Sequence, residues 1–458
     1  MAWNEIQVLI FLLQPLPMGD DSDGVDNVLE DVCLAPDELV KDVWATVRLL
    51  GRGNFGKVYH MCNIKDGREA ALKMENVASP DKCLKIESEV MKKMKNHKGV
   101  VQIYDEGARL NYKFILMTLC GWDLTRISEE LRNKFSDSTI IRLAIRTLIA
   151  LKRLHEIGYI HRDLKPCNFA LHCDAESFQI YLLDFGMTRQ YAFKDSEKKW
   201  QIRQRRSVCR FRGTLRYCSI NMHKRIELGR GDDLWSWLYM MLELRCPLPW
   251  RNSSHPEKVE VLKTMLINNV ISKDPVNKVF QPVLTHLQSL TYPDRPNYKM
   301  IYELLYAKMT ESGIRLTDPM DYGMLQPTTI PELISVQEKY NIPSREKSRM
   351  RQTEEEEAEA LKLEFEPSSG DVPGGINLEK KFVGDHRHEN NNNNMNISMK
   401  SPNVVLKTPE ALKDSASKRK NKEKEKDSAS KRKNKEKEKD SASKRKNKDF
   451  GSKRSVKH

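Results

Sequence analysis

The chain has 458 residues, of which 39% are hydrophobic and 31% charged, and its formal net charge is +14. This balance is typical of a water-soluble protein with a sizeable core, and the apolar run from Val8 to Leu13 is too short to span a bilayer, so no membrane association is expected. The nine cysteines are scattered without a CxxC pair, which argues against a zinc site and a disulfide framework and favours the reducing cytoplasm or nucleus.

Regular structure is predicted to begin at Trp44, after an N-terminal extension, residues 1–43, that we expect to be flexible. The stretch VRLLGRGNFGKVYHM predicts a β-hairpin with a glycine-rich turn. Its glycines form a GxGxxGxV frame, and without Cβ atoms such a loop can lie close over phosphates and offer them backbone amides, while the valine contacts an adenine. These residues are Gly51, Gly53, Gly56 and Val58. Taken alone, the glycines also fit a tight hairpin with no ligand.

A lysine and a glutamate are predicted to meet beside this loop. The strand Glu69–Lys73 ends in an AxK sequence, Ala71 to Lys73, and brings the lysine towards the same pocket. The following stretch SPDKCLKIESEVMKKMKNH predicts a helix with Asp81 in its first turn. Glu87 lies on the inner face of that helix, so its carboxylate could hold Lys73 against phosphates. An ordinary surface carboxylate is the alternative.

The central motif is YIHRDLKPCNF, Tyr159 to Phe169, which follows a predicted buried strand, Lys113 to Gly121, and a long buried helix, Ser136 to Gly158. Its HxDxKxxN frame places an acid, a base and an amide in one loop, as phosphoryl transfer requires. Asp163 could accept a hydroxyl proton, Lys165 could neutralise the transferred group, and Asn168 could bind a metal. A basic turn before a buried strand is the plainer interpretation.

A further buried strand, IYLLDFG, ends at Asp184, 21 residues after Asp163, and places a metal-binding carboxylate there in addition to Asn168. Together the glycine loop, AxK, helical glutamate, HRDxKxxN and DFG motifs resemble the protein kinase family in order and spacing. The resemblance implies an α+β, bilobal fold, with a small N-lobe of antiparallel sheet plus one helix and a large, mainly helical C-lobe. It also implies ATP and Mg²⁺ as cofactors and protein substrates, and Lys165 points to serine and threonine as acceptors.

A narrower resemblance is to the casein kinase 1 superfamily, and within it most closely to the tau-tubulin kinases. It rests on FRGTLRY, GRGDDLWS, LPWR and TDPMDY, and it extends over residues 44–322. By this resemblance Met117 is the gatekeeper, Thr118 and Leu119 contact adenine, Thr214 supports the catalytic loop and Asp233 anchors it. The chain departs from the family pattern at a few positions near the cleft, namely Trp122, Asp123, Cys167, Met187 and Thr188.

The segment from Asp184 to Ser219 is strongly basic, which favours acidic or already phosphorylated peptides. In the family, the arginine that matches Arg216 contributes to an anion site that can recognise a primed phosphate. The lysine that completes this site has no certain match here, and Lys263 is a candidate. A merely solvated basic loop is the alternative.

After Tyr322 the chain is predicted to leave the folded domain. Residues 323–413 are expected to hold one charged helix, Ser344 to Glu366, followed by linker. Residues 414–458 repeat DSASKRKNKEKEK and carry +11 of the net charge, so a disordered basic tail is expected. This tail could bind a nuclear-import receptor, nucleic acid or an acidic polymer, or it could serve only as a solubiliser.

The leading hypothesis is therefore an ATP-dependent serine/threonine protein kinase, expected to be monomeric. The competing class is a binding protein, either a pseudokinase scaffold or an adaptor that binds polyanions through its tail. Loss of a catalytic residue would favour that class, and none is lost from the motifs above.

Overall fold

The computed structural model describes residues 32–374, except 54–55, 79–82, 96, 98, 133, 174–177, 324–329, 343–352, 367 and 369. Most of the predicted N-terminal extension and all of the predicted basic tail lie outside the described residues. So does Asp81, which was expected in the first turn of a helix. Within the described part, no helix is long and apolar enough to cross a bilayer.

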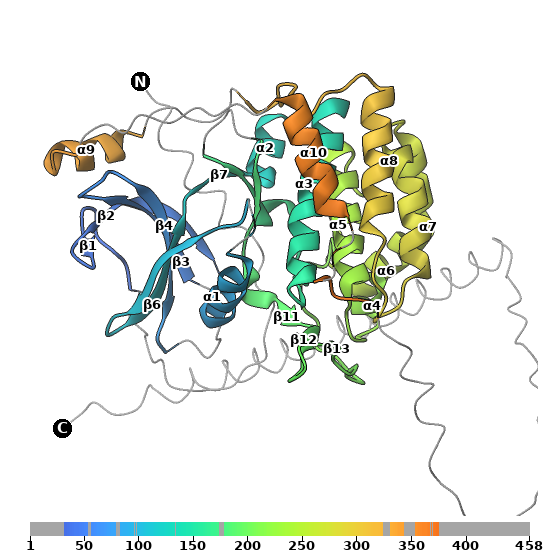
Figure 1. Ribbon diagram of the computed structural model, residues 1–458, viewed down its shortest axis with the longest axis horizontal. Coiled ribbons are helices and arrows are strands. Elements are labelled where there is room, and N and C mark those ends of the chain that lie inside the picture. The colour runs from blue at the N-terminus through green and yellow to red at the C-terminus, as the bar shows by residue number, and fades with distance from the viewer. Residues whose placement is uncertain are drawn as a thin grey trace, which may run out of the picture. The chain divides into compact units, whose positions relative to one another are not determined.

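The small lobe is a six-stranded antiparallel sheet in the order β1-β2-β3-β4-β6-β5 with one helix packed beside it (Figure 1). The elements are β1 (Leu39–Val40), β2 (Trp44–Gly53), β3 (Gly56–Asn63), β4 (Glu69–Asn76), α1 (Cys83–Met94), β5 (Ile103–Ala108) and β6 (Tyr112–Thr118). Helix α1 buries Leu84, Val90, Met91 and Met94 on one face, as its apolar spacing predicts, and Glu87 lies on the same face.

The large lobe is mainly helical, which confirms the predicted α+β bilobal fold. Its helices are α2 (Leu124–Glu130), α3 (Asp137–Glu156), α4 (Ile220–His223), α5 (Arg230–Arg245), α6 (Pro256–Lys273), α7 (Gln281–Ser289) and α8 (Tyr298–Glu311). The remaining strands are short and pair in small sheets outside the six-stranded sheet. They are β7 (Cys120–Asp123), β8 (Tyr159–Ile160), β9 (Phe169–His172), β10 (Ile180–Leu182), β11 (Arg189–Gln190), β12 (Ala192–Lys194) and β13 (Trp200–Ile202).

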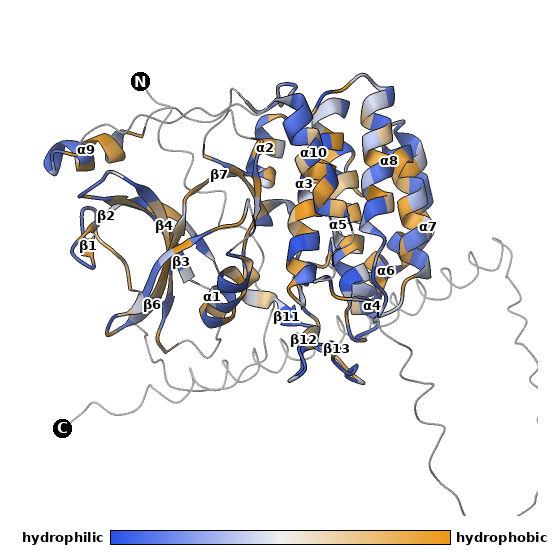
Figure 2. Cartoon of the chain, in the orientation of Figure 1, coloured by the Kyte–Doolittle hydropathy of each residue, from blue (hydrophilic) through white to orange (hydrophobic). Residues whose placement is uncertain are grey.

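Helix α3 is the centre of the large-lobe core and positions the catalytic loop at its C-terminal end. It begins after Ser136, whose hydroxyl accepts a hydrogen bond from the Thr139 amide, and most of its side chains are buried. Trp237 of α5 is fully buried against it and donates from Nε1 to Thr147 Oγ1 at 2.9 Å. Apolar positions are frequent along the helices of this lobe in Figure 2. The buried helix predicted from Ser136 to Gly158 is confirmed.

The packed part of the chain is wider than the predicted limits 44–322 at both ends. Residues 32–43, expected to be flexible, lie against the small-lobe sheet, where Leu34 and Val40 are buried. The buried Lys57 donates from Nζ to the Val32 carbonyl at 2.8 Å, and the Leu34 amide donates to the Tyr59 hydroxyl at 3.2 Å. A second small helix, α9 (Pro331–Lys339), covers β2 on the small lobe.

A last helix, α10 (Glu354–Phe365), returns to the large lobe and packs against α8 (Figure 1). Phe365 stacks on Tyr302 with ring centroids 4.5 Å apart, and Glu357 accepts from Arg146 at 2.7 Å. The predicted charged helix from Ser344 therefore starts only at Glu354, after a Thr353 capping box, and residues 343–352 lie outside the described residues. It is part of the folded domain because its apolar residues Leu361 and Phe365 are buried.

Phe365→Ala should destabilise the folded protein, whereas Leu363→Ala should not. Phe365 is 3% exposed and loses its stack on Tyr302, so we expect a loss of about 3 kcal/mol in unfolding free energy. Leu363 is 65% exposed on the same helix, and its truncation should change that free energy by less than about 0.5 kcal/mol. Denaturant unfolding measures both, and equal midpoints for the two variants would show that α10 does not dock.

Candidate active site

The glycine-rich turn joins β2 to β3, with Gly53 opposite Gly56, and residues 54–55 lie outside the described residues. A Cβ atom on Gly51 or Gly53 would meet nothing within 4 Å, so this side of the turn is open. Gly56 has a different requirement. Its φ is +129°, and a Cβ would lie 1.9 Å from the Met74 carbonyl oxygen, so β3 could not pair with β4. Packing alone therefore demands glycine at this position.

Gly56→Ala should destabilise the apo protein by at least about 1–3 kcal/mol, because both the backbone angle and the contact with Met74 must change. Gly51→Ala is the matched control, and its unfolding free energy should stay within about 0.5 kcal/mol of wild type. Thermal unfolding without nucleotide compares the two. A wild-type melting temperature for Gly56→Ala would contradict this role of Gly56.

Lys73 is held between two carboxylates from separate elements. It lies on β4 opposite Val58 of β3, and its Nζ is 2.6 Å from Glu87 Oε2 on α1 and 3.1 Å from Asp184 Oδ1. Burial alone would lower the pKa of Lys73, but the two carboxylates raise it above its ordinary value. The ammonium is therefore charged and fixed in position, and the predicted meeting of Lys73 with Glu87 is present.

The small-lobe wall of the cleft continues along β4 and β6. Ala71 of β4 pairs with Met117 of β6, and Ile103 of β5 pairs with Met117 from the other side. The chain leaves β6 at Thr118, whose hydroxyl accepts from the Gln102 amide at 2.9 Å, and Leu119 leads into β7. The residues predicted to contact adenine thus lie on one continuous wall, and the contact itself stays a prediction.

The catalytic loop places Asp163 at the centre of a polar cluster. Thr214 Oγ1 donates to Asp163 Oδ1 at 2.7 Å, and Lys165 Nζ lies 2.9 Å from Asp163 Oδ2. Asn168 Nδ2 donates to the Asp163 carbonyl at 2.8 Å, and the amide oxygen of Asn168 accepts a weak hydrogen bond from Cys167 Sγ at 3.7 Å. Although burial lowers it, the pKa of Lys165 is raised by Asp163.

Asp233 of α5 anchors the backbone of this loop through hydrogen bonds. Its Oδ2 accepts from the His161 amide at 2.6 Å and its Oδ1 from the Arg162 amide at 2.8 Å, and Arg162 has a left-handed φ of +69°. His155 of α3 donates from Nε2 to the same carboxylate at 2.9 Å. Burial raises the pKa of Asp233, but these donors bring it below its ordinary value. The anchoring role that the family resemblance implied has a matching geometry.

Asp184 lies two residues after β10 and has a left-handed φ of +60°. Its neighbour Leu183 donates its amide to the Asn168 carbonyl at 2.8 Å and accepts from His161 Nε2 at 3.0 Å, so the two loops are tied together. Burial opposes ionisation, yet Lys73 lowers the pKa of Asp184 below its ordinary value. An ionised carboxylate and the amide oxygen of Asn168 are oxygen ligands of the kind that Mg²⁺ prefers, so the residues fit this ion.

Lys263 does not complete an anion site with Arg216, as the sequence had suggested it could. Lys263 of α6 is 1% exposed and donates from Nζ to the carbonyls of Leu215 and Cys218, at 2.8 and 2.5 Å. Burial lowers its pKa to about 8. Lys263 therefore tethers the backbone near Arg216 and offers no charge at the surface. Arg216 itself is partly exposed, with Nη1 3.4 Å from Glu243.

Sequence reasoning missed that part of the basic segment is neutralised internally. Glu227, whose side chain is 1% exposed, accepts from Arg206 Nε at 2.6 Å and lies 3.3 Å from Arg189 Nε. Burial raises the pKa of Glu227, but these arginines lower it below its ordinary value. A lone glutamate in the basic stretch HKRIELGR was the available signal. Arg189 and Arg206 therefore form ion pairs within the protein, and their charge is only partly available to a substrate.

Comparison with known proteins agrees with this geometry. The protein kinase domain family matches residues 44–307, which is more than half of the chain. A Dictyostelium discoideum protein named as a serine/threonine-protein kinase is 33% identical over 297 residues, which are 64% of this chain and 59% of that protein. A Caenorhabditis elegans protein named in the same way is 32% identical over 60% of this chain and 80% of its own length. The serine/threonine-protein kinase spe-6 of C. elegans is 31% identical over 61% of this chain and 75% of its own length. The chain belongs to the protein kinase family.

Proposed function

We propose that the protein transfers the γ-phosphate of ATP to serine and threonine hydroxyls of proteins, with Mg²⁺ as the metal. Serine/threonine kinase activity agrees with the family match and with the names of the three relatives. The observation that carries the proposal is the ion pair of 2.6 Å between Lys73 and Glu87, with Asp184 3.1 Å from the same ammonium. A pseudokinase scaffold is disfavoured because the chain retains all of the residues to which catalytic roles are assigned: Lys73, Asp163, Lys165, Asn168 and Asp184.

The chain's own residues would act as follows. Lys73, fixed by Glu87, orients the α- and β-phosphates, and Asp163 positions the acceptor hydroxyl. As the bond from its oxygen to the γ-phosphorus forms and the bond to ADP breaks, Asp163 takes the hydroxyl proton. Lys165, 2.9 Å from that carboxylate, neutralises charge on the transferred group. Mg²⁺ held by Asp184 and Asn168 would neutralise the phosphate oxygens when bound.

We further propose the narrower placement in the casein kinase 1 superfamily, near the tau-tubulin kinases. Its support is the sequence of the segment from Phe211 to Arg251 and the TDPMDY stretch. Of the roles that come with this placement, Thr214 and Asp233 have matching contacts to Asp163 and to the catalytic-loop backbone. Adenine contact by Met117, Thr118 and Leu119 remains part of the proposal.

The proposed substrates carry acidic or phosphorylated residues near the acceptor. Arg216 is partly exposed, and several other arginines of the basic segment are exposed, among them Arg203, Arg205 and Arg210. Protein location in the cytoplasm or nucleus, a monomeric state, and binding of the basic tail to an import receptor, nucleic acid or an acidic polymer are proposals that rest on composition and charge.

Arg216→Gln tests whether Arg216 recognises a phosphate already present on the substrate. We expect kcat/KM for a peptide with a phosphoserine near its acceptor to fall about tenfold, because one charge-assisted contact is lost. The unphosphorylated peptide should change less than about twofold. Arg315→Gln, at a well-exposed arginine on the outer surface, is the matched control. An equal loss for both peptides would assign Arg216 to general integrity instead of phosphate recognition.

A further inference from the structure

Residues 370–374, here called the strap, continue from α10 into the part of the large lobe that supports the activation segment, residues 184–219. Val372 is fully buried, and it belongs to an apolar cluster with Tyr191, Ala192 and Leu228. Trp200 and Phe211 pack against the same cluster. Apart from Val372 and Leu228, these residues belong to the activation segment. A side chain from the C-terminal region therefore completes the apolar support of that segment.

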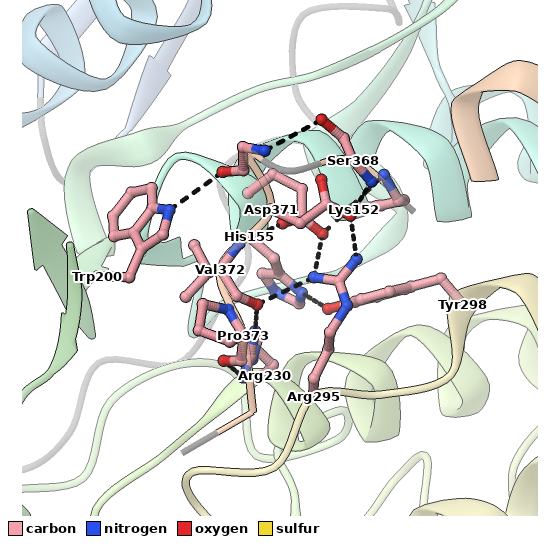
Figure 3. Close-up of polar contacts among 12 residues, drawn as sticks. Lys152, His155, Trp200, Arg230, Arg295, Tyr298, Ser368, Asp371, Val372 and Pro373 are labelled. Atoms are coloured by element: carbon pink, nitrogen blue, oxygen red, sulfur yellow. Dashed lines mark hydrogen bonds and ion pairs between the residues drawn. The ribbon is translucent and has the colours of Figure 1, made fainter. Parts of the chain in front are cut away.

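The strap backbone is held by charged side chains from three distant places (Figure 3). The Val372 amide donates to Glu156 Oε2 at 2.9 Å, and its carbonyl accepts from Arg230 Nη1 at 2.8 Å and from Arg295 Nη1 at 3.1 Å. Asp371 Oδ2 accepts from Arg295 Nη2 at 2.8 Å. Each of these contacts joins residues at least 76 positions apart. The strap is thus fixed by specific contacts and not only by its link to α10.

Arg230 depends on the strap for its hydrogen bonds. The side chain is 1% exposed, and three backbone carbonyls accept from it: Val372 at 2.8 Å, Pro373 at 2.9 Å and Pro293 at 3.1 Å. Its guanidinium also lies over the Tyr191 ring, 5.0 Å from the centroid. Removal of the strap would take two of these three carbonyls from a buried cation, which is costly unless the site rearranges. A shift of Arg230 would alter its contact with Tyr191, which belongs to the activation segment.

The strap also contacts the activation segment directly. Trp200 Nε1 donates to the Gly370 carbonyl at 3.0 Å, and Trp200 is the first residue of β13, which pairs with β12 in a hairpin (Figure 3). At its other side the strap meets Glu156 at the end of α3 and Arg230 at the start of α5. These two helices carry the catalytic loop and Asp233. One short segment therefore connects the activation segment to both helices that hold the catalytic loop.

We propose that the strap is a positioning element for the proposed kinase reaction: by holding Trp200, Tyr191 and Arg230 it keeps the activation segment in the shape that receives the protein substrate. The inference rests on the proposed function for its activity readout. The groups that orient ATP lie on the small lobe, on the catalytic loop and at Asp184, whereas the strap contacts the activation segment from Tyr191 onward. Loss of the strap should therefore weaken substrate binding much more than ATP binding. Its effect should be a higher KM for the acceptor peptide.

Val372→Asp in the full chain is the principal test, because it places a carboxylate in an apolar cluster beside Glu156. We expect hydrogen exchange of the strap and of residues 191–202 to accelerate, and the KM for an acidic peptide to rise about tenfold or more. The KM for ATP should stay within about twofold of wild type. Val372→Ile keeps the apolar contact, and its hydrogen exchange and KM values should be those of the wild type. Leu363→Asp adds the same charge at an exposed site of α10 and should have no effect.

Asp371→Arg gives a second route, since it opposes Arg295 without altering the apolar cluster. Faster exchange of the strap with an unchanged peptide KM in either variant would overturn the proposal. Unchanged strap exchange in both variants would also overturn it, because the named contacts would then not hold the strap. An inactive wild-type protein would instead contradict the proposed function. In that case exchange at residues 191–202 would still show whether the strap orders the activation segment.

Discussion

Asp163→Asn is expected to lower kcat by about 10²- to 10⁴-fold while the protein stays folded, since the variant removes the group that takes the hydroxyl proton. The asparagine oxygen can still accept the 2.7 Å hydrogen bond that Thr214 donates, so the loop should keep its shape. The variant loses the negative partner of Lys165, which makes the effect larger than the loss of a base alone. The measurement is steady-state phosphorylation of an acidic peptide, with thermal unfolding recorded in parallel.

Lys73→Arg provides the companion measurement on the nucleotide side. The arginine keeps the charge but cannot place a single ammonium between Glu87 and Asp184, at 2.6 and 3.1 Å, so a loss of about 10²-fold or more in kcat/KM is expected. If the turnover of either variant is within about fivefold of the wild-type value, the role assigned to that residue is wrong. A large drop in melting temperature would show that a variant had unfolded, and its kinetics would then not bear on the mechanism.

Asp233→Ala is expected to have the largest effect on stability, about 3–5 kcal/mol in unfolding free energy. The substitution removes the acceptor of the His161 and Arg162 amides and of His155, all in a buried site. Arg162 would then keep its left-handed backbone conformation without the acceptor that holds its amide. Chemical denaturation should show the loss as a lower midpoint at an unchanged slope.

Two variants make the Asp233 result specific. Asp233→Asn retains an oxygen acceptor and should lose less stability than the alanine variant. Asp66→Ala, at an exposed carboxylate of the small lobe, should change the unfolding free energy by less than about 0.5 kcal/mol. If Asp233→Ala is no less stable than Asp66→Ala, the catalytic loop is not anchored from α5.

The lobes and the cleft could be predicted because the sequence patterns that specify them each extend over only a few neighbouring residues. The glycine turn, the amphipathic face of α1 and the buried helix α3 follow from periodicity over a few residues, and the motifs place Lys73, Asp163 and Asp184 at recognisable spacings. Their convergence needed the family resemblance, because Lys73 and Asp184 are 111 residues apart in the chain. The structure brings the predicted residues together, and the contacts with ATP stay predictions.

The errors arose where burial is decided by distant packing. Lys263 looks like a surface lysine on an amphipathic helix, and only the carbonyls of Leu215 and Cys218 explain why it is buried. Residues 354–365 look like a solvated charged helix, because four consecutive glutamates obscure the stripe that ends at Phe365. Val372 carries no sequence signal at all, since its partners lie in the activation segment and at the start of α5.

Transfer of labelled phosphate from γ-labelled ATP to an acidic protein, followed by identification of the acceptor amino acids, tests the central claim most directly. With Mg²⁺ the wild-type chain should produce phosphoserine and phosphothreonine, chelation of the metal should abolish the transfer, and the Asp163→Asn protein, folded to the same extent, should be at background. Transfer by the Asp163→Asn protein at the wild-type rate, or no transfer by a folded wild-type chain with Mg²⁺ and ATP, would contradict the account.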